Sequence, residues 1–286
     1  MKLPLHLIEA AALASALAAG GSPVVVVDCR HDLTRPDWGR AQFAAAHIPG
    51  AVFAHLDLDL SGPVTPQSGR HPLPDPARLA HFLAAAGVDA ATHVVAYDQD
   101  KSMYAARLWW LLRWLGHARV SVLDGGLAAW AAAGLPLDST SAVPAARKFS
   151  AGPGLVQGAT TADVQRDLAA GRILLLDARA ADRFAGQNES IDPVAGHVPG
   201  ARNQPFAQNL GHDGRLLPAA ELSRLWRGAL GNTPASRVIA MCGSGVTACH
   251  NLLAMELAGL PGARLYAGSW SEWIRDPARP VATGPA

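Results

Sequence analysis

Short apolar runs alternate along this chain with longer stretches that have helical periodicity. The runs at residues 24–27, 93–97, 173–176 and 237–241 are rich in Val, Ile, Ala and Leu. Such runs are typical of strands that are buried on both faces of a parallel sheet. Residues 248–257 instead place Leu252, Leu253, Met255 and Leu257 on one broad apolar face of a helix. The alternation predicts an α/β fold in which helices flank parallel sheets.

The same landmarks occur twice in the same order. Asp-Cys-Arg at residues 28–30 has a counterpart in Asp-Ala-Arg at 177–179, and His-Ile-Pro-Gly-Ala at 47–51 recurs as His-Val-Pro-Gly-Ala at 197–201. Two matched landmarks at nearly one offset indicate a duplicated unit. Residues 136–158 are rich in Pro, Ser, Ala and Gly without a period, which is typical of a linker. We therefore predict an N-terminal domain over residues 1–138, a linker over 139–158 and a C-terminal domain over 159–286.

Composition limits the possible partners. The 286 residues are half hydrophobic, and 24 basic residues balance 23 acidic ones, so nothing points to nucleic acid and a small molecule is the expected partner. Three cysteines without regular spacing argue against a disulfide framework and for a reducing compartment, the cytoplasm. His6 and Glu9 interrupt the apolar run at residues 1–20, so we predict a first amphipathic helix there rather than a signal sequence. No run is long enough to predict a membrane span.

The candidate nucleophile is Cys242, which follows the apolar run at 237–241 and begins the loop Cys-Gly-Ser-Gly-Val-Thr. The carboxyl end of a parallel strand is where open α/β sheets bind ligands. Inward-turned N–H groups of the loop and the start of the next helix would favour the thiolate, which is the reactive form. Gly243 and Gly245 would permit the required backbone conformations and leave space above the sulfur. Such a cysteine would act as a nucleophile in covalent catalysis. The alternative is that Cys242 is a small buried apolar residue.

Other candidates for catalysis are weaker. A cysteine phosphatase loop has an arginine six residues after its cysteine, and Ala248 stands there in this chain. We predict that Cys29 and Cys249 only pack in the interior. His47 and His197 occur in both halves, including the half without a catalytic cysteine, so we predict that they stabilise turns.

The first half carries no counterpart of the nucleophile, because Asp98 stands in the place of Cys242. We therefore expect the first domain to be structural. No Cys/His group has the spacing of a metal site and no dinucleotide fingerprint is present, so we expect neither a metal nor an organic cofactor. Three tryptophans at helical spacing, Trp109, Trp110 and Trp114, predict a packing face.

The two His-(Ile/Val)-Pro-Gly-Ala turns, the loop at residues 242–247 and the closing Gly-Ser-Trp-Ser-Glu-Trp at 268–273 resemble the tandem-domain rhodanese superfamily. The loop is more similar to Cys-Gly-Ser-Gly-Val-Thr of 3-mercaptopyruvate sulfurtransferases than to Cys-Arg-Lys-Gly-Val-Thr of thiosulfate sulfurtransferases. The resemblance implies two tandem rhodanese-like domains and a sulfurtransferase that forms a persulfide on Cys242. It also implies that Gly243, Gly245, Val246 and Thr247 contact the substrate.

A proton relay is implied by the resemblance to the mercaptopyruvate enzymes. By position, Ser244 matches the serine of that relay, His71 the histidine and Asp57 the aspartate, with Asp59 as a close competitor. A departing enolate needs a proton, and histidine can relay one near neutral pH. The alternatives are that His71 anchors a proline-rich loop and that Ser244 caps a helix.

The resemblance also implies an arginine that binds the anionic donor. Arg183 matches the arginine of the family's Gly-Arg-Phe motif, while Arg179 would either bind donor or pair with Asp177. Residues 189–193 offer no second donor arginine of the kind that mercaptopyruvate enzymes carry. We favour 3-mercaptopyruvate as the donor and keep thiosulfate as the alternative. Cyanide, a small thiol or a protein thiol would be the acceptor. A non-catalytic persulfide-binding or sensing module is the rival of a different class.

Overall fold

The computed structural model describes residues 3–20 and 23–285 of the chain. It divides the chain into two compact units. The first unit comprises Met1–Gly62, Pro74–Leu155 and His212–Leu216, and the second comprises Pro63–Leu73, Val156–Gly211 and Leu217–Ala286. Each half of the sequence therefore supplies one short segment to the unit formed mainly by the other half. Among the described residues, no helix is long and apolar enough to cross a membrane.

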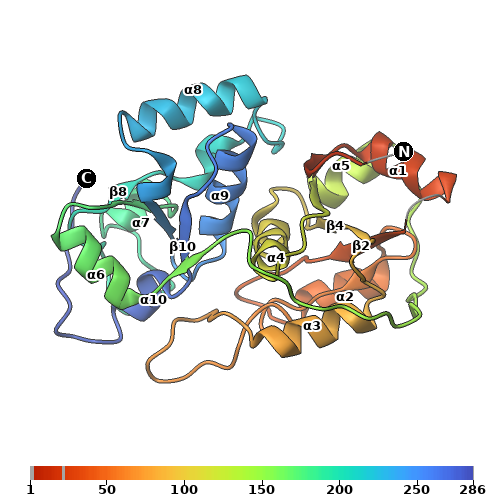
Figure 1. The fold of residues 1–286 in the computed structure, drawn as a ribbon, viewed down its shortest axis with the longest axis horizontal. Helices are drawn as coiled ribbons and strands as arrows, with labels where there is room; N and C mark the ends of the chain where they lie inside the picture. Colours follow the sequence, from red (N-terminus) through yellow and green to blue (C-terminus); the bar gives the residue numbers. More distant parts are fainter. Residues whose placement is uncertain (1–2, 21–22, 286) are drawn as a thin grey trace. The chain divides into compact units, whose positions relative to one another are not determined.

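The first unit is built on a five-stranded parallel sheet (Figure 1). Its strand order is β1 (His6–Ile8), β5 (Val120–Leu123), β4 (His93–Tyr97), β2 (Val24–Asp28) and β3 (Val52–Phe53). The helices are α1 (Ala10–Ala19), α2 (Trp38–Ala45), α3 (Pro76–Ala85), α4 (Met103–Trp114) and α5 (Gly126–Ala132). The central strand β4 is buried along its whole length, as an apolar run that is covered on both faces requires.

The second unit repeats this topology. Its parallel sheet has the order β6 (Gly158–Ala159), β10 (Arg264–Tyr266), β9 (Val238–Met241), β7 (Leu174–Asp177) and β8 (Arg202–Asn203). The helical segments are α6 (Thr161–Ala169), α7 (Ala181–Phe184), η1 (Phe206–Asn209), α8 (Ala219–Leu230), η2 (Ala235–Arg237), α9 (Thr247–Leu257) and α10 (Ser269–Trp273). Both sheets thus place their first, fifth, fourth, second and third strands in that order, which agrees with the duplication seen in the sequence.

The N-terminal run differs from the expected helix in one respect. The described part begins with strand β1, and helix α1 starts only at Ala10. Leu7 and Ile8 pair with Val122 and Leu123 at the edge of the first sheet, so sheet pairing overrides the helical tendency of these residues. Residues 1 and 2 of the predicted helix lie outside the described residues.

The repeated histidine turns are structural, as predicted. His47 Nδ1 lies 2.6 Å from the carbonyl oxygen of Phe43 and its ring stacks on that phenylalanine at a centroid distance of 4.0 Å. His197 makes the equivalent contacts with Phe184, at 2.8 Å and 3.8 Å. Each histidine therefore fixes a turn next to its sheet.

The predicted tryptophan packing face is also present. Trp109 and Trp110 are fully buried on α4, and the rings of Trp110 and Trp114 stack at 6.0 Å.

Candidate active site

Cys242 lies directly after β9 and before α9, at the carboxyl end of the second sheet. Its side chain is buried, with 2% of the residue exposed. The Gly245 N–H donates to Cys242 Sγ at 3.1 Å, and the Cys242 N–H donates to Ser269 Oγ at 3.0 Å. Helix α9 begins two residues beyond Gly245, so its N-terminal end faces the loop. A sulfur anion is stabilised in such a position by the N–H donor and by the positive end of the helix.

Glycine is required at positions 243 and 245 of the loop for two different physical reasons. Gly245 has φ +79°, and a Cβ there would lie 2.4 Å from the carbonyl oxygen of Ala267, so only glycine fits. Gly243 provides space. A Cβ on Gly243 would lie 2.9 Å from Arg70 Nη2 and 3.8 Å from Arg183 Nη2. Two guanidinium groups therefore lie directly above the loop that carries the cysteine.

The structure brings His71 and Ser244 together. His71 Nδ1 lies 2.7 Å from Ser244 Oγ, and both residues are buried, with 4% and 5% exposed. The segment at residues 63–73 that carries His71 belongs to the second unit, although it precedes helix α3 in the sequence. Two contacts anchor this segment: the Arg70 N–H donates to Ser271 Oγ at 3.0 Å, and Arg275 Nε donates to the Ser68 carbonyl at 3.1 Å. A histidine and a hydroxyl thus meet on the loop of the candidate nucleophile.

Arg183 is held by two buried carboxylates. Its Nε and Nη2 donate to Glu189 over distances of 2.8–3.2 Å, and Nη2 also lies 3.3 Å from Asp192 Oδ2. The Glu189 and Asp192 side chains are only 2% and 1% exposed. The sequence did not indicate that Arg183 is paired with these two carboxylates. Any anionic donor that binds Arg183 must share the guanidinium with these carboxylates or displace them.

Arg70 is a functional candidate that the sequence analysis missed. Arg70 Nη1 forms an ion pair with Asp192, and its Nε has no hydrogen-bond partner among the described residues. Burial lowers the pKa of the Arg70 guanidinium, while the nearby Cys242 opposes that shift because a sulfur anion favours the charged arginine. The only signal in the sequence was its position next to His71 in a long loop.

Arg179 is 3% exposed and braces the site instead of facing an open space. Its guanidinium makes a bidentate pair with Asp177 and donates to the Gly196 carbonyl at 2.8 Å. It also stacks over Trp270 at 4.9 Å from the ring centroid. These contacts favour the bracing alternative over donor binding.

Asp57 and Asp59 lie in the first unit, whereas His71 and Ser244 lie in the second. Asp59 Oδ2 accepts a hydrogen bond from the His55 N–H at 2.8 Å and so holds the local turn. Asp57 is partly exposed, and its N–H donates to His55 Nδ1 at 3.1 Å. The local geometry therefore gives Asp59 a structural contact and leaves the Asp57 carboxylate at the surface of its unit.

Asp98 shows how the first unit fills the place of the nucleophile. Its carboxylate accepts hydrogen bonds from the backbone N–H groups of Ser102, Tyr104 and Ala105 at 2.9, 2.8 and 3.3 Å. An anion therefore occupies the loop between β4 and α4, as a sulfur anion would in the second unit. Burial raises the pKa of Asp98 to about 6.

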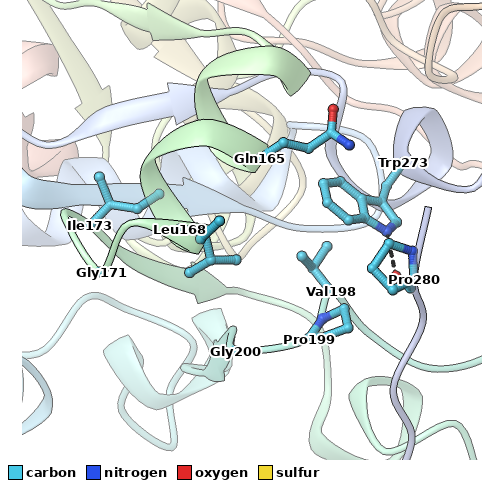
Figure 2. Close-up of a pocket in the computed structure, with 10 residues that line it drawn as sticks. Gln165, Leu168, Gly171, Ile173, Val198, Pro199, Gly200, Trp273 and Pro280 are labelled. Carbon is cyan, nitrogen blue, oxygen red and sulfur yellow. Dashed lines mark hydrogen bonds between the residues drawn. The ribbon is translucent and has the colours of Figure 1, made fainter.

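A separate apolar pocket of about 480 Å³ lies between α6, the turn at residues 198–200 and Trp273 (Figure 2). Gln165 is the only lining residue with a polar side chain apart from the indole of Trp273. None of the predicted site residues lines it. The pocket is therefore separate from the candidate site at Cys242.

The model of the rhodanese-like domain matches the chain twice, at residues 9–133 and 160–276. The chain belongs to the rhodanese family. A probable 3-mercaptopyruvate sulfurtransferase of Pseudomonas aeruginosa is 51% identical over 263 residues, which cover 91% of this chain and 93% of that protein. A putative thiosulfate sulfurtransferase, SseB of Mycobacterium tuberculosis, is 40% identical over 98% of both chains.

Solved structures agree with this family. The rhodanese-fold 3-mercaptopyruvate sulfurtransferase SseA of Escherichia coli superimposes with a TM-score of 0.80 at 32% identity, covering 94% of this chain and all of that one. The predicted α/β fold with two tandem rhodanese-like domains is confirmed, as is the predicted enzyme class, a sulfurtransferase.

Proposed function

We propose that this rhodanese-family protein transfers sulfur from 3-mercaptopyruvate through a persulfide on Cys242. The observation that carries the proposal is the contact of 2.7 Å between His71 Nδ1 and Ser244 Oγ on an uncharged Gly-Ser-Gly loop. When mercaptopyruvate gives up its sulfur, pyruvate leaves as an enolate that needs a proton, and this pair supplies one. When thiosulfate gives up its sulfur, sulfite leaves and needs no such proton. The relative named for mercaptopyruvate supports the same choice.

The reaction has two steps. In the first, the Cys242 thiolate attacks the sulfur of the donor, the carbon–sulfur bond breaks, and its electron pair remains on the carbon side as the enolate of pyruvate. The Ser244 hydroxyl, relayed by His71, protonates that enolate. In the second step, an acceptor thiolate or cyanide attacks the outer sulfur of the persulfide and releases the Cys242 thiolate. Atoms and charge balance without an external oxidant or a cofactor.

The loop residues support the intermediate. The Gly245 N–H that donates to Cys242 Sγ would also stabilise the persulfide anion, together with the amides of Val246 and Thr247 at the start of α9. Gly243 leaves the sulfur accessible beneath the guanidinium groups. These residues therefore serve by their backbone and by their small size.

The donor carboxylate would bind between Arg183 and Arg70. Both guanidinium groups reach the space above Gly243, and together they replace the second donor arginine that residues 189–193 do not provide. Arg179 serves mainly as a brace. Asp57 is proposed as the group that orients His71, on the family resemblance, and the cytoplasm remains the proposed compartment.

The test measures how fast each donor adds one sulfur to the protein, by intact mass. We expect mercaptopyruvate to load Cys242 more efficiently than thiosulfate. Ser244→Ala removes the hydroxyl that protonates the pyruvate enolate, so it should slow loading by mercaptopyruvate about 100-fold. Loading by thiosulfate should stay nearly unchanged. Ser223→Ala, on the surface of α8, is the matched control. Equal slowing with both donors would refute the relay.

The nucleophile has its own controls. Cys242→Ser should abolish the adduct with every donor, whereas Cys249→Ser should retain it, because Cys249 is buried within α9 and its thiol donates to the Gly245 carbonyl at 3.3 Å. A wild-type protein that gains no sulfur from either donor would instead support the non-catalytic module. Thiosulfate becomes the donor if it loads faster than mercaptopyruvate in the wild type.

A further inference from the structure

Three potential metal ligands meet in the first unit. The ligand atoms of His31, His55 and Asp57 lie within 4.8 Å of one another. His31 follows strand β2 and His55 follows strand β3, two neighbours in the parallel sheet, so the fold brings them to the same carboxyl edge. This is the edge at which α/β sheets bind ligands. The sequence spacing of 24 and 2 residues gives no sign of the cluster.

The two imidazoles are buried and the carboxylate faces solvent. His31 is 2% and His55 4% exposed, while the Asp57 side chain is 39% exposed. The rings of His31 and His55 meet edge to face at a centroid distance of 5.7 Å. A cation could therefore enter past Asp57 and reach nitrogen ligands that are shielded from water.

Neighbouring groups hold the ligands from behind. Gln99 Nε2 donates to the His31 carbonyl at 2.9 Å, and the Asp59 carboxylate accepts from the His55 N–H at 2.8 Å. Because both contacts fix the backbone of a ligand, ordering the site costs little conformational freedom.

His55 Nδ1 already accepts a hydrogen bond on the side where Asp57 lies. The Asp57 N–H donates to His55 Nδ1 at 3.1 Å, so that nitrogen carries no proton. Asp57 Oδ2 lies 3.9 Å from the same nitrogen, so a small closing movement of the partly exposed carboxylate would bring the two atoms to the separation of about 3.3 Å that tetrahedral coordination requires. Metal binding would transfer the lone pair of Nδ1 from the amide to the ion.

We propose that His31, His55 and Asp57 form a binding site for a divalent transition metal in the first unit. Two imidazoles and one carboxylate suit Zn²⁺ and similar ions, because nitrogen ligands disfavour Mg²⁺ and Ca²⁺. Water completes the coordination shell. The site goes beyond the proposed sulfur transfer and does not depend on it, since it contains no residue of the Cys242 loop.

Zinc binding to the full-length Cys242→Ser protein tests the proposal, because this background removes the reactive thiol as a competing ligand. We expect one equivalent of Zn²⁺ in competition with a chromophoric chelator. His31→Gln and Asp57→Asn should each weaken binding at least 30-fold, while His81→Gln, a histidine on α3 of the same unit, should not change it. Co²⁺ in place of Zn²⁺ should give an absorption spectrum that the His31→Gln variant loses.

Two results would overturn the site. One is less than a tenth of an equivalent of bound Zn²⁺ in the well-folded Cys242→Ser protein, with circular dichroism as the check on folding. The other is binding that His31→Gln, His55→Gln and Asp57→Asn all leave unchanged. Sulfur loading of the wild type is measured in metal-free buffer, so failure of the metal site and failure of the sulfur transfer are separate outcomes.

Discussion

Replacing Gly245 with alanine tests the loop at residues 242–247 at its most constrained position. Gly245 adopts φ +79°, and the left-handed conformation costs a residue with a Cβ about 1–2 kcal/mol. The new Cβ would also lie 2.4 Å from the oxygen and 2.8 Å from the Cα of Ala267, backbone atoms that have little freedom to move. Such overpacking costs about 1–3 kcal/mol more. We therefore expect Gly245→Ala to lower the free energy of unfolding of the second unit by about 2–5 kcal/mol.

Differential scanning calorimetry measures this loss, at about 4 °C per kcal/mol for a unit of this size. Two controls separate the causes. Gly171→Ala has φ +64° but no atom within 4 Å of its Cβ, so it carries only the conformational cost. Gly228→Ala lies in helix α8 with open space around it and should stabilise the unit by about 1 kcal/mol. A melting temperature of Gly245→Ala within about 2 °C of that of Gly171→Ala would show that the contact with Ala267 costs no stability.

Three further changes test the charges of the molecule. Asp192→Asn removes a buried carboxylate that competes with the donor for Arg70 and Arg183. It should therefore lower the KM of mercaptopyruvate about tenfold and the KM of dianionic thiosulfate by more than that. A raised KM in steady-state assays would contradict this. Arg70→Gln should raise KM for mercaptopyruvate at least 30-fold, with Arg78→Gln as the control, and an unchanged KM would show that Arg70 binds no donor. Burial lowers the pKa of His93 to about 4, so the stability of the folded chain rises by about 3 kcal/mol as the pH rises from 4 to 6.5. Burial also raises the pKa of Asp98 from 3.8 to about 6, so stability falls by about 3 kcal/mol as the pH rises through that range. Relative to the wild type, we therefore expect the urea unfolding free energy of His93→Gln to fall by about 3 kcal/mol between pH 4 and 6.5, and parallel profiles would contradict this.

The core elements follow from local patterns. The apolar run at 237–241 predicts β9 to within one residue, and the periodicity at 248–257 predicts α9, because both elements are buried and their pattern reports burial directly. The position of Cys242 at the end of β9 follows from these two elements. Strand β1 did not follow, since its three residues are defined only by a partner strand more than 100 residues away.

The charges around the nucleophile could not be predicted in the same way. Arg70 and Asp192 meet because the loop at 63–73 packs on the second unit, and that loop has no period from which a contact could be inferred. The pairing of Arg183 with Glu189 depends on how a short irregular segment folds back after α7. Side-chain partners in loops depend on long-range packing rather than on local propensity.

The segment at residues 63–73 lies far in the sequence from the Cys242 loop, although both belong to the second unit. The candidate nucleophile and the residues proposed to select the donor are therefore encoded separately. The sulfur atom is held by residues encoded after position 237, whereas Arg70 and His71 are encoded near the middle of the first half and pack on the same unit. With the proposed roles of Arg70 and His71, substitutions in this segment would alter the choice of donor without replacing any residue of the Cys242 loop. A protein built in this way can acquire a new donor while it keeps its nucleophile.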